Sequence, residues 1–122
     1  MNRIFLILAG LFGASGVILG ALSSHAFKTI LTPEQIDIFK LGVQYQLYHA
    51  LALFGVAIFS YYKKNLLLNI AGWLFTLGII FFSGTMYSIT YFGLPNIGTA
   101  PVGGFAFMFG WFMLIIIAFK TK

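Results

Sequence analysis

The chain has 122 residues, of which 61% are hydrophobic and only 7% are charged, and its mean hydropathy is +1.01. A soluble domain carries about 25% charged residues, so this composition excludes an ordinary soluble fold. The net charge of +5 comes from basic residues scattered near the ends of apolar stretches, which excludes a nucleic-acid-binding stripe, and the lack of cysteine excludes disulfides and thiolate chemistry.

Four long apolar stretches occupy most of the chain, and none of them contains a charged residue. They cover residues 4–22, 42–62, 66–91 and 102–119. A helix needs about 20 mostly apolar residues to cross a hydrocarbon core about 30 Å thick, and each stretch meets or approaches that length. The sequence therefore predicts an all-α integral membrane protein, with residues 1–122 forming a single four-helix transmembrane domain.

The first apolar stretch resembles a signal peptide, because Arg3 precedes it. Its length of about 19 residues exceeds the roughly 7–15 residues of a usual signal sequence, so we expect a retained helix. Small residues lie near one face of this helix, namely Ala9, Gly13, Gly16 and Gly20. Small residues allow membrane helices to approach closely, so this face either packs within the chain, which we favour, or forms a dimer interface.

The connections between the stretches also carry signals. Thr32-Pro33-Glu34-Gln35 has the pattern of a capping box, so we expect a short interfacial helix that leads directly into the second span. The connection at residues 63–65 is very short and predicts an antiparallel hairpin of spans two and three. Residues 93–101 are rich in glycine and proline and predict a tight connection.

Basic residues near the helix ends predict the orientation. With four spans, the side of the two termini holds five of them, Arg3, Lys63, Lys64, Lys120 and Lys122, whereas the other side holds two, Lys28 and Lys40. We therefore expect a multi-pass protein of the plasma membrane with both termini in the cytoplasm.

Polar residues within the spans gather in the half of the membrane away from the termini. Tyr45 and His49 are four residues apart, as are Ser83 and Tyr87, so each pair shares a helix face. The candidate cluster, a polar pocket or network, comprises His25, Tyr45, Gln46, His49, Ser83, Tyr87, Gly103 and Gly104.

Three interpretations of this cluster remain open. We favour a network of hydrogen bonds between helices, since neutral polar residues in membrane bundles usually have that role. A ligand pocket comes second, and a metal or haem site third. Two histidines are the minimum for a bis-histidine haem, zinc would need Glu34 or Asp37 as a third ligand, and no metal-binding motif is present. We therefore predict neither a metal nor a cofactor.

Charged residues are absent from the spans, which argues against a proton-driven carrier. Side chains suited to catalysis are few, which argues against an enzyme. The leading interpretation is a non-enzymatic structural or interaction protein. Its expected partners are membrane lipids, a partner membrane protein or a second copy of itself, and not nucleic acid. The alternative is a small-molecule binding or transport protein with a pocket around Gln46 and His49 in the outer half of the membrane.

Several motifs resemble those of a family of small bacterial inner-membrane proteins that also includes eukaryotic transmembrane protein 256. The matching segments are residues 12–21 with His25, residues 42–53, residues 82–87, and residues 101–104 with Gly110 and Trp111. Here Ala100 precedes the Pro-x-Gly-Gly step where the family pattern favours threonine, and Thr99 is displaced by one position. The resemblance implies four transmembrane helices and no established activity.

Overall fold

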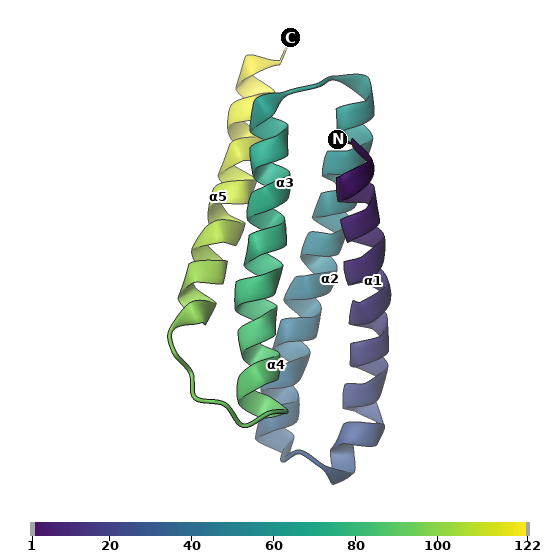
Figure 1. Ribbon diagram of the computed structural model, residues 1–122, viewed down its shortest axis with the longest axis vertical. Helices are drawn as coiled ribbons and strands as arrows, with labels where there is room; N and C mark the ends of the chain where they lie inside the picture. The colour runs from purple at the N-terminus through teal and green to yellow at the C-terminus, as the bar shows by residue number, and fades with distance from the viewer. Residues whose placement is uncertain (1, 122) are drawn as a thin grey trace.

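The computed structural model describes residues 2–121 and forms a bundle of four long helical segments (Figure 1). Its elements are α1 (Asn2–Ser24), the short 3-10 helix η1 (Ala26–Thr29), α2 (Pro33–Tyr62), α3 (Leu66–Gly78), the π-helical turn η2 (Ile79–Ser83), α4 (Gly84–Thr90) and α5 (Thr99–Lys120). Elements α3, η2 and α4 follow one another without a break and form the third segment. All four segments are long and apolar enough to cross a membrane, so the predicted all-α four-span bundle is confirmed.

Helix α2 begins at the predicted capping box. The backbone N–H of Thr32 donates to the side-chain oxygen of Gln35 at 2.9 Å, and the backbone N–H of Gln35 donates to the Thr32 hydroxyl at 3.2 Å. The predicted short interfacial helix is the first part of α2, which continues unbroken for 30 residues. Ile36 and Phe39 are buried, so this part packs against the bundle and is no separate element lying along the membrane surface.

Helix α1 packs mainly against α2, whereas α5 packs against α3 and η2. In Figure 1, α1 and α5 lie on opposite sides of the third segment, and α2 lies further back, between the third segment and α1. The start of α1, the end of α5 and the connection at residues 63–65 lie toward one end of the bundle (Figure 1). We call this the basic end, because it carries Arg3, Lys63, Lys64 and Lys120. Lys122, assigned to the same side from the sequence, lies outside the described residues.

Two apolar cores hold the helices together. The larger core lies toward the basic end and includes the fully buried Phe5, Leu53 and Phe75. A smaller core at the opposite end joins η1 to α2, where the rings of Phe27 and Phe39 meet edge to face at 5.2 Å. The bundle is therefore packed at both ends, and Gln46 and His49 of α2 lie between the two cores.

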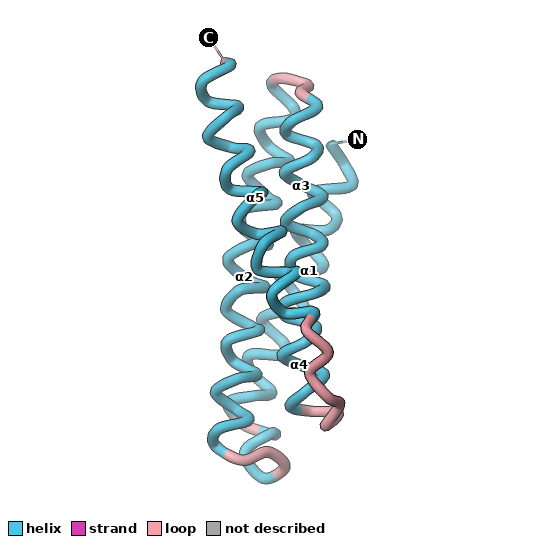
Figure 2. The backbone as a smooth tube through the Cα atoms, turned by 90° about the vertical axis from the view of Figure 1, so that its left-hand side faces the viewer, coloured by secondary structure: helices cyan, strands magenta, loops and turns pink. Residues whose placement is uncertain are grey.

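Helix α5 comes into backbone contact with the third segment at η2. A Cβ atom added to Gly103 would lie only 2.4 Å from the backbone nitrogen of Phe82, and one added to Gly78 would lie 2.2 Å from the Phe107 ring. Helix α5 begins partway along the bundle, and the loop at residues 91–98 rises along the side to reach it (Figures 1 and 2). The loop ends at Gly98, whose φ of 83° favours glycine.

Candidate functional site

Gln46 of α2 joins three helices through its side-chain amide. Its Nε2 atom donates to the Phe12 carbonyl at 2.9 Å and to the Ser15 hydroxyl at 2.8 Å, both on α1. Its Oε1 atom accepts a hydrogen bond from the Tyr87 hydroxyl of α4 at 2.6 Å. Both amide hydrogens and the amide oxygen therefore have partners, and the side chain is 3% exposed.

His49, one helical turn further along α2, joins α2 to α5. The indole Nε1–H of Trp111 donates to His49 Nε2 at 3.0 Å. Because an indole N–H can only donate, Nε2 must accept, and the ring proton of the neutral imidazole lies on Nδ1. Nδ1 in turn donates to the Tyr45 carbonyl at 2.7 Å. The ring also stacks on Phe107 with centroids 3.6 Å apart, so His49 is held on both nitrogens and on one face.

Two further contacts connect the third segment to its neighbours. The Ser83 hydroxyl donates to the Gly42 carbonyl of α2 at 2.6 Å. The Thr85 hydroxyl of α4 forms a hydrogen bond with the Thr99 hydroxyl at the start of α5. The Thr99 hydroxyl, which is displaced by one position from the family pattern, thus contacts another helix. Polar groups consequently connect α2 with every other long segment.

The other predicted cluster members lie near this network or away from it. The Tyr45 ring, partly exposed, packs against Phe82 at 4.8 Å. Gly103 is buried against η2, whereas a Cβ added to Gly104 would meet nothing within 4 Å. His25 does not join the cluster: it is exposed just after α1, with no hydrogen bond from its side chain among the described residues. The turn into η1 brings Phe27 inward in its place.

The small residues of α1 divide into two groups. A Cβ added to Gly16 would lie 2.7 Å from the Leu47 side chain of α2, and one added to Gly20 would lie 3.4 Å from Val43. Ala9 is 7% exposed and belongs to the larger core. Gly13, in contrast, has nothing within 4 Å of an added Cβ. Part of this face therefore packs within the chain, and part is open.

The buried polar side chains of the described residues have their hydrogen bonds within the protein. Among residues 2–121, every buried side-chain nitrogen or oxygen atom has a hydrogen-bond partner. In the same part of the chain, no three His, Cys, Asp or Glu side chains are grouped closely enough to hold a metal ion. Ser83 donates to a backbone carbonyl and not to His49, so the two residues do not form a nucleophile–base pair.

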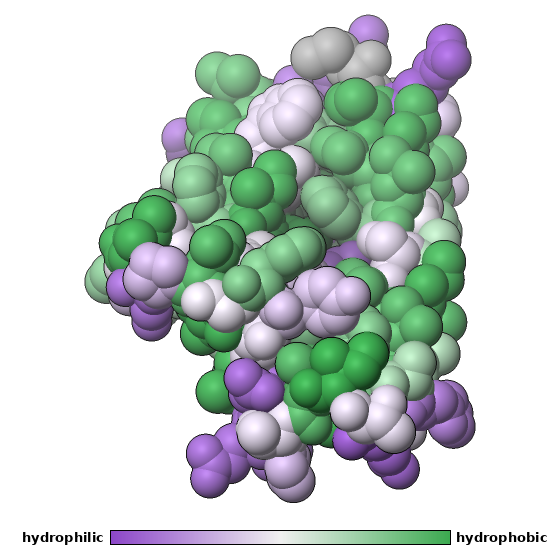
Figure 3. All heavy atoms as spheres, turned by 60° about the horizontal axis from the view of Figure 1, so that its bottom comes forward, coloured by the Kyte–Doolittle hydropathy of each residue, from purple (hydrophilic) through white to green (hydrophobic). Residues whose placement is uncertain are grey.

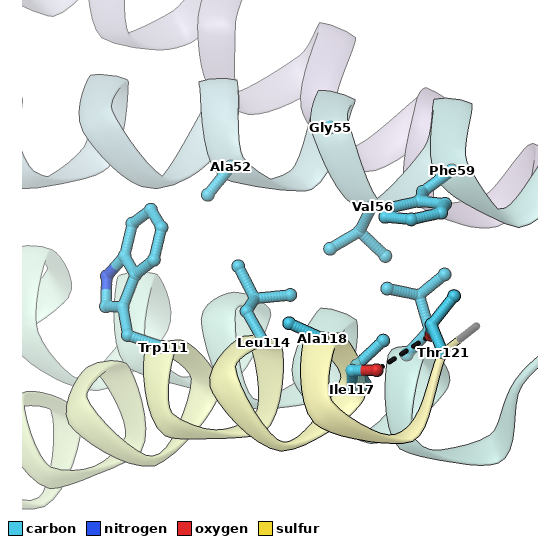
Figure 4. Close-up of a pocket in the computed structure, with 10 residues that line it drawn as sticks. Ala52, Gly55, Val56, Phe59, Trp111, Leu114, Ile117, Ala118 and Thr121 are labelled. Carbon is cyan, nitrogen blue, oxygen red and sulfur yellow. Dashed lines mark hydrogen bonds between the residues drawn. The ribbon is translucent and has the colours of Figure 1, made fainter.

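Two apolar grooves flank α2. The α1–α2 groove has a volume of about 550 Å³ and is lined by Leu6, Ala9, Gly10, Gly13, Val17, Leu47, Ala50, Leu51 and Phe54. The α2–α5 groove has a volume of about 480 Å³ and is lined by Ala52, Gly55, Val56, Phe59, Leu68, Trp111, Leu114, Ile117, Ala118 and Thr121 (Figure 4). In the space-filling view, hydrophobic residues cover most of the visible face and hydrophilic ones lie at its margins (Figure 3).

Sequence reasoning missed three members of the network. Ser15 lies in the first matching family segment and is assigned no role from the sequence, although a hydroxyl in a span signals a polar partner nearby. Trp111 likewise lies in a matching segment and is assigned no role from the sequence, although an indole N–H in apolar surroundings usually finds an acceptor. The Gly42 carbonyl gave no signal, because a backbone group in a helix becomes an acceptor only through tertiary packing.

Comparison with known proteins identifies the family. The family model described as "Protein of unknown function (DUF423)" matches residues 19–104. A UPF0382 membrane protein of Staphylococcus aureus is 36% identical over 119 residues, covering 97% of each chain. The UPF0382 membrane protein YwdK of Bacillus subtilis is 33% identical over 120 residues, covering 97% of this chain and 98% of its own.

A UPF0382 membrane protein of Haemophilus influenzae is 33% identical over 125 residues, covering all of this chain and 98% of its own. No solved structure is significantly similar to the chain. These matches confirm the resemblance to a bacterial membrane family of unknown function. The chain belongs to the DUF423 family of membrane proteins.

Proposed function

We propose that this protein is a non-enzymatic membrane protein that binds lipid acyl chains in the grooves beside α2, and that its polar network has a structural role. One observation carries the proposal. The polar groups between the helices satisfy one another, whereas the unfilled space is lined by apolar side chains. Apolar grooves of this kind match acyl chains in their chemistry.

The alternative is a pocket for a small polar molecule around Gln46 and His49. Such a ligand would have to break hydrogen bonds that already exist, since both nitrogens of His49 and all three polar sites of Gln46 are engaged. Breaking these contacts in a low-dielectric environment is costly, because the freed groups lose their partners. The closed network therefore favours the structural role.

The lipid-binding proposal can be tested by thermal unfolding in detergent, with and without added phosphatidylcholine. Lipid at about 100 times its Kd should stabilise the protein by roughly 2.7 kcal/mol. Gly55→Leu should weaken this response, because an added Cβ at Gly55 meets nothing within 4 Å and the leucine would enter the α2–α5 groove. Gly104→Leu is the matched control, since Gly104 is equally open but lines neither groove.

His49→Ala separates the two functions. If the network is structural, the variant should melt at a lower temperature yet keep its lipid response. Stabilisation by an added small polar molecule that is lost in His49→Ala and kept in Gly55→Leu would instead support the pocket around Gln46 and His49.

We further propose that the protein lies in the plasma membrane with the basic end in the cytoplasm. The excess of Lys and Arg at this end supports that orientation. A reporter that is active only outside the cytoplasm should be silent when fused after Lys122 and active when inserted near Asn96. The reverse pattern would show that the basic end faces outward.

A further inference from the structure

We propose that the α2–α5 groove binds the acyl chain of an anionic phospholipid whose headgroup lies against the lysines of the basic end. This inference rests on the lipid-binding function proposed above, and it adds the class of lipid and the place where the lipid is bound.

The length and position of the groove fit one acyl chain. Along α5 the lining runs from Trp111 to Thr121, which is about 15 Å at 1.5 Å per residue. That length is about half of a hydrocarbon core roughly 30 Å thick, or one leaflet. At the inner end of this run, the hydrogen bond between Trp111 and His49 joins α5 to α2. The groove therefore extends from the middle of the bundle toward the basic end.

Small side chains leave the groove open. Ala52 and Gly55 line it from α2, and Ala118 lines it from α5 (Figure 4). Helix α5 packs against α3 and η2, which leaves the space beside α2 uncovered. A transmembrane helix is about 10 Å wide and must cross the whole membrane, so a groove of about 480 Å³ confined to one leaflet fits a lipid chain better than a partner helix.

The charges at the mouth of the groove select the headgroup. Lys63 follows Phe59 of the lining by one helical turn, with its backbone N–H bonded to the Phe59 carbonyl at 3.1 Å. Lys120 is adjacent to Thr121 of the lining, and both lysines and Lys64 are exposed. The two acidic residues of the chain, Glu34 and Asp37, lie near the start of α2, at the end of the bundle opposite the basic end. Among the described residues, the groove mouth thus offers cations without nearby acidic side chains, and basic sites between membrane helices attract anionic headgroups.

Trp111 provides a reporter inside the groove. The chain has two tryptophans, so Trp73→Phe leaves Trp111 as the only one. This variant would be reconstituted in bilayers that contain phosphatidylglycerol or phosphatidylcholine with brominated acyl chains, which quench tryptophan fluorescence on contact. We expect brominated phosphatidylglycerol to compete for the groove at least about fivefold better than brominated phosphatidylcholine, which corresponds to the effect of one lysine near a membrane surface. Added salt should reduce this preference, because part of it is electrostatic.

Replacement of the lysines tests the headgroup contact. In the Trp73→Phe background, the triple change Lys63→Gln, Lys64→Gln and Lys120→Gln should abolish the preference for phosphatidylglycerol while leaving quenching by phosphatidylcholine. The matched control is Lys28→Gln with Lys40→Gln, which removes charge at the opposite end and should leave the preference unchanged. All five lysines are exposed, so none of these changes disturbs a core.

The outcomes separate this inference from the proposed function. Equal quenching by the two lipids, or a preference that survives the triple lysine change, would overturn the assignment of an anionic phospholipid while leaving acyl-chain binding intact. Quenching that is the same before and after Gly55→Leu would show that the lipid contacts the 45% exposed Trp111 outside the α2–α5 groove, which would overturn this inference together with acyl-chain binding in that groove. A selectivity that disappears in Gly55→Leu and in the lysine variant alike is the result that we expect.

Discussion

The hydrogen bonds of Gln46 predict how strongly the polar network stabilises the bundle. Gln46→Leu keeps the approximate size of the side chain but removes the two hydrogen bonds to α1 and the one from Tyr87. A hydrogen bond between membrane helices contributes about 0.6 kcal/mol on average, so loss of all three should lower the free energy of unfolding by about 2 kcal/mol. The half-buried Tyr87 hydroxyl loses its acceptor, which adds to the loss.

The assay is reversible unfolding in mixed micelles of a mild detergent and sodium dodecyl sulfate, followed by circular dichroism. Gln44→Leu is the matched control, because Gln44 lies on the same helix but is exposed, and its replacement should change the free energy by less than about 0.5 kcal/mol. Tyr87→Phe removes one of the three bonds and should cost about 0.6 kcal/mol. A Gln46→Leu protein as stable as Gln44→Leu would refute the view that this network holds α1 and α4 on α2.

Two pairs of glycine substitutions test the close contacts between helices. Gly16→Leu should fold poorly, because its added Cβ would already lie 2.7 Å from a side chain of α2, whereas Gly13→Leu should fold normally; size-exclusion chromatography and thermal melting distinguish the two. A well-folded Gly16→Leu protein of unchanged size and melting temperature would show that this face is not a packing surface. Gly103→Ala should destabilise the bundle by roughly 1–3 kcal/mol or more, since its methyl group would lie 2.4 Å from the backbone nitrogen of Phe82, while Gly104→Ala should be neutral or slightly stabilising. Equal melting temperatures for these two alanine variants would contradict the backbone contact between α5 and η2.

The fold was predictable because apolar length alone determines a membrane helix. The four predicted spans correspond to the four helical segments, and the capping box placed the start of α2 correctly at Thr32. The predicted boundaries differ where a helix extends beyond the hydrocarbon core. Helix α5 begins at Thr99 and not at residue 102, since its first turn continues the helix on the loop side of the apolar run.

The candidate site was only partly predictable. Helical spacing placed Tyr45 and His49 on one face, and the structure joins the backbone carbonyl of the first to the ring of the second. Spacing within one helix carries no information on the rotation of its neighbours, so neither the bond from Ser83 to Gly42 nor the bond from Trp111 to His49 could be read from it. His25 was misplaced for a related reason, since the chain turns into η1 directly after α1.

The π-helical turn η2 affects how the family can change in length. A π turn accommodates one residue more than an α-helical turn, so the third segment contains an extra residue between Gly78 and Gly84. Loss of one residue there would convert the turn to regular α-helix and leave the helices on both sides in their present orientation. Loss of one residue elsewhere in α3 or α4 would rotate everything beyond it by about 100°, and Tyr87 would no longer face Gln46. In alignments of this family, a single-residue gap in the third span is therefore physically reasonable at residues 79–83 and at few other places.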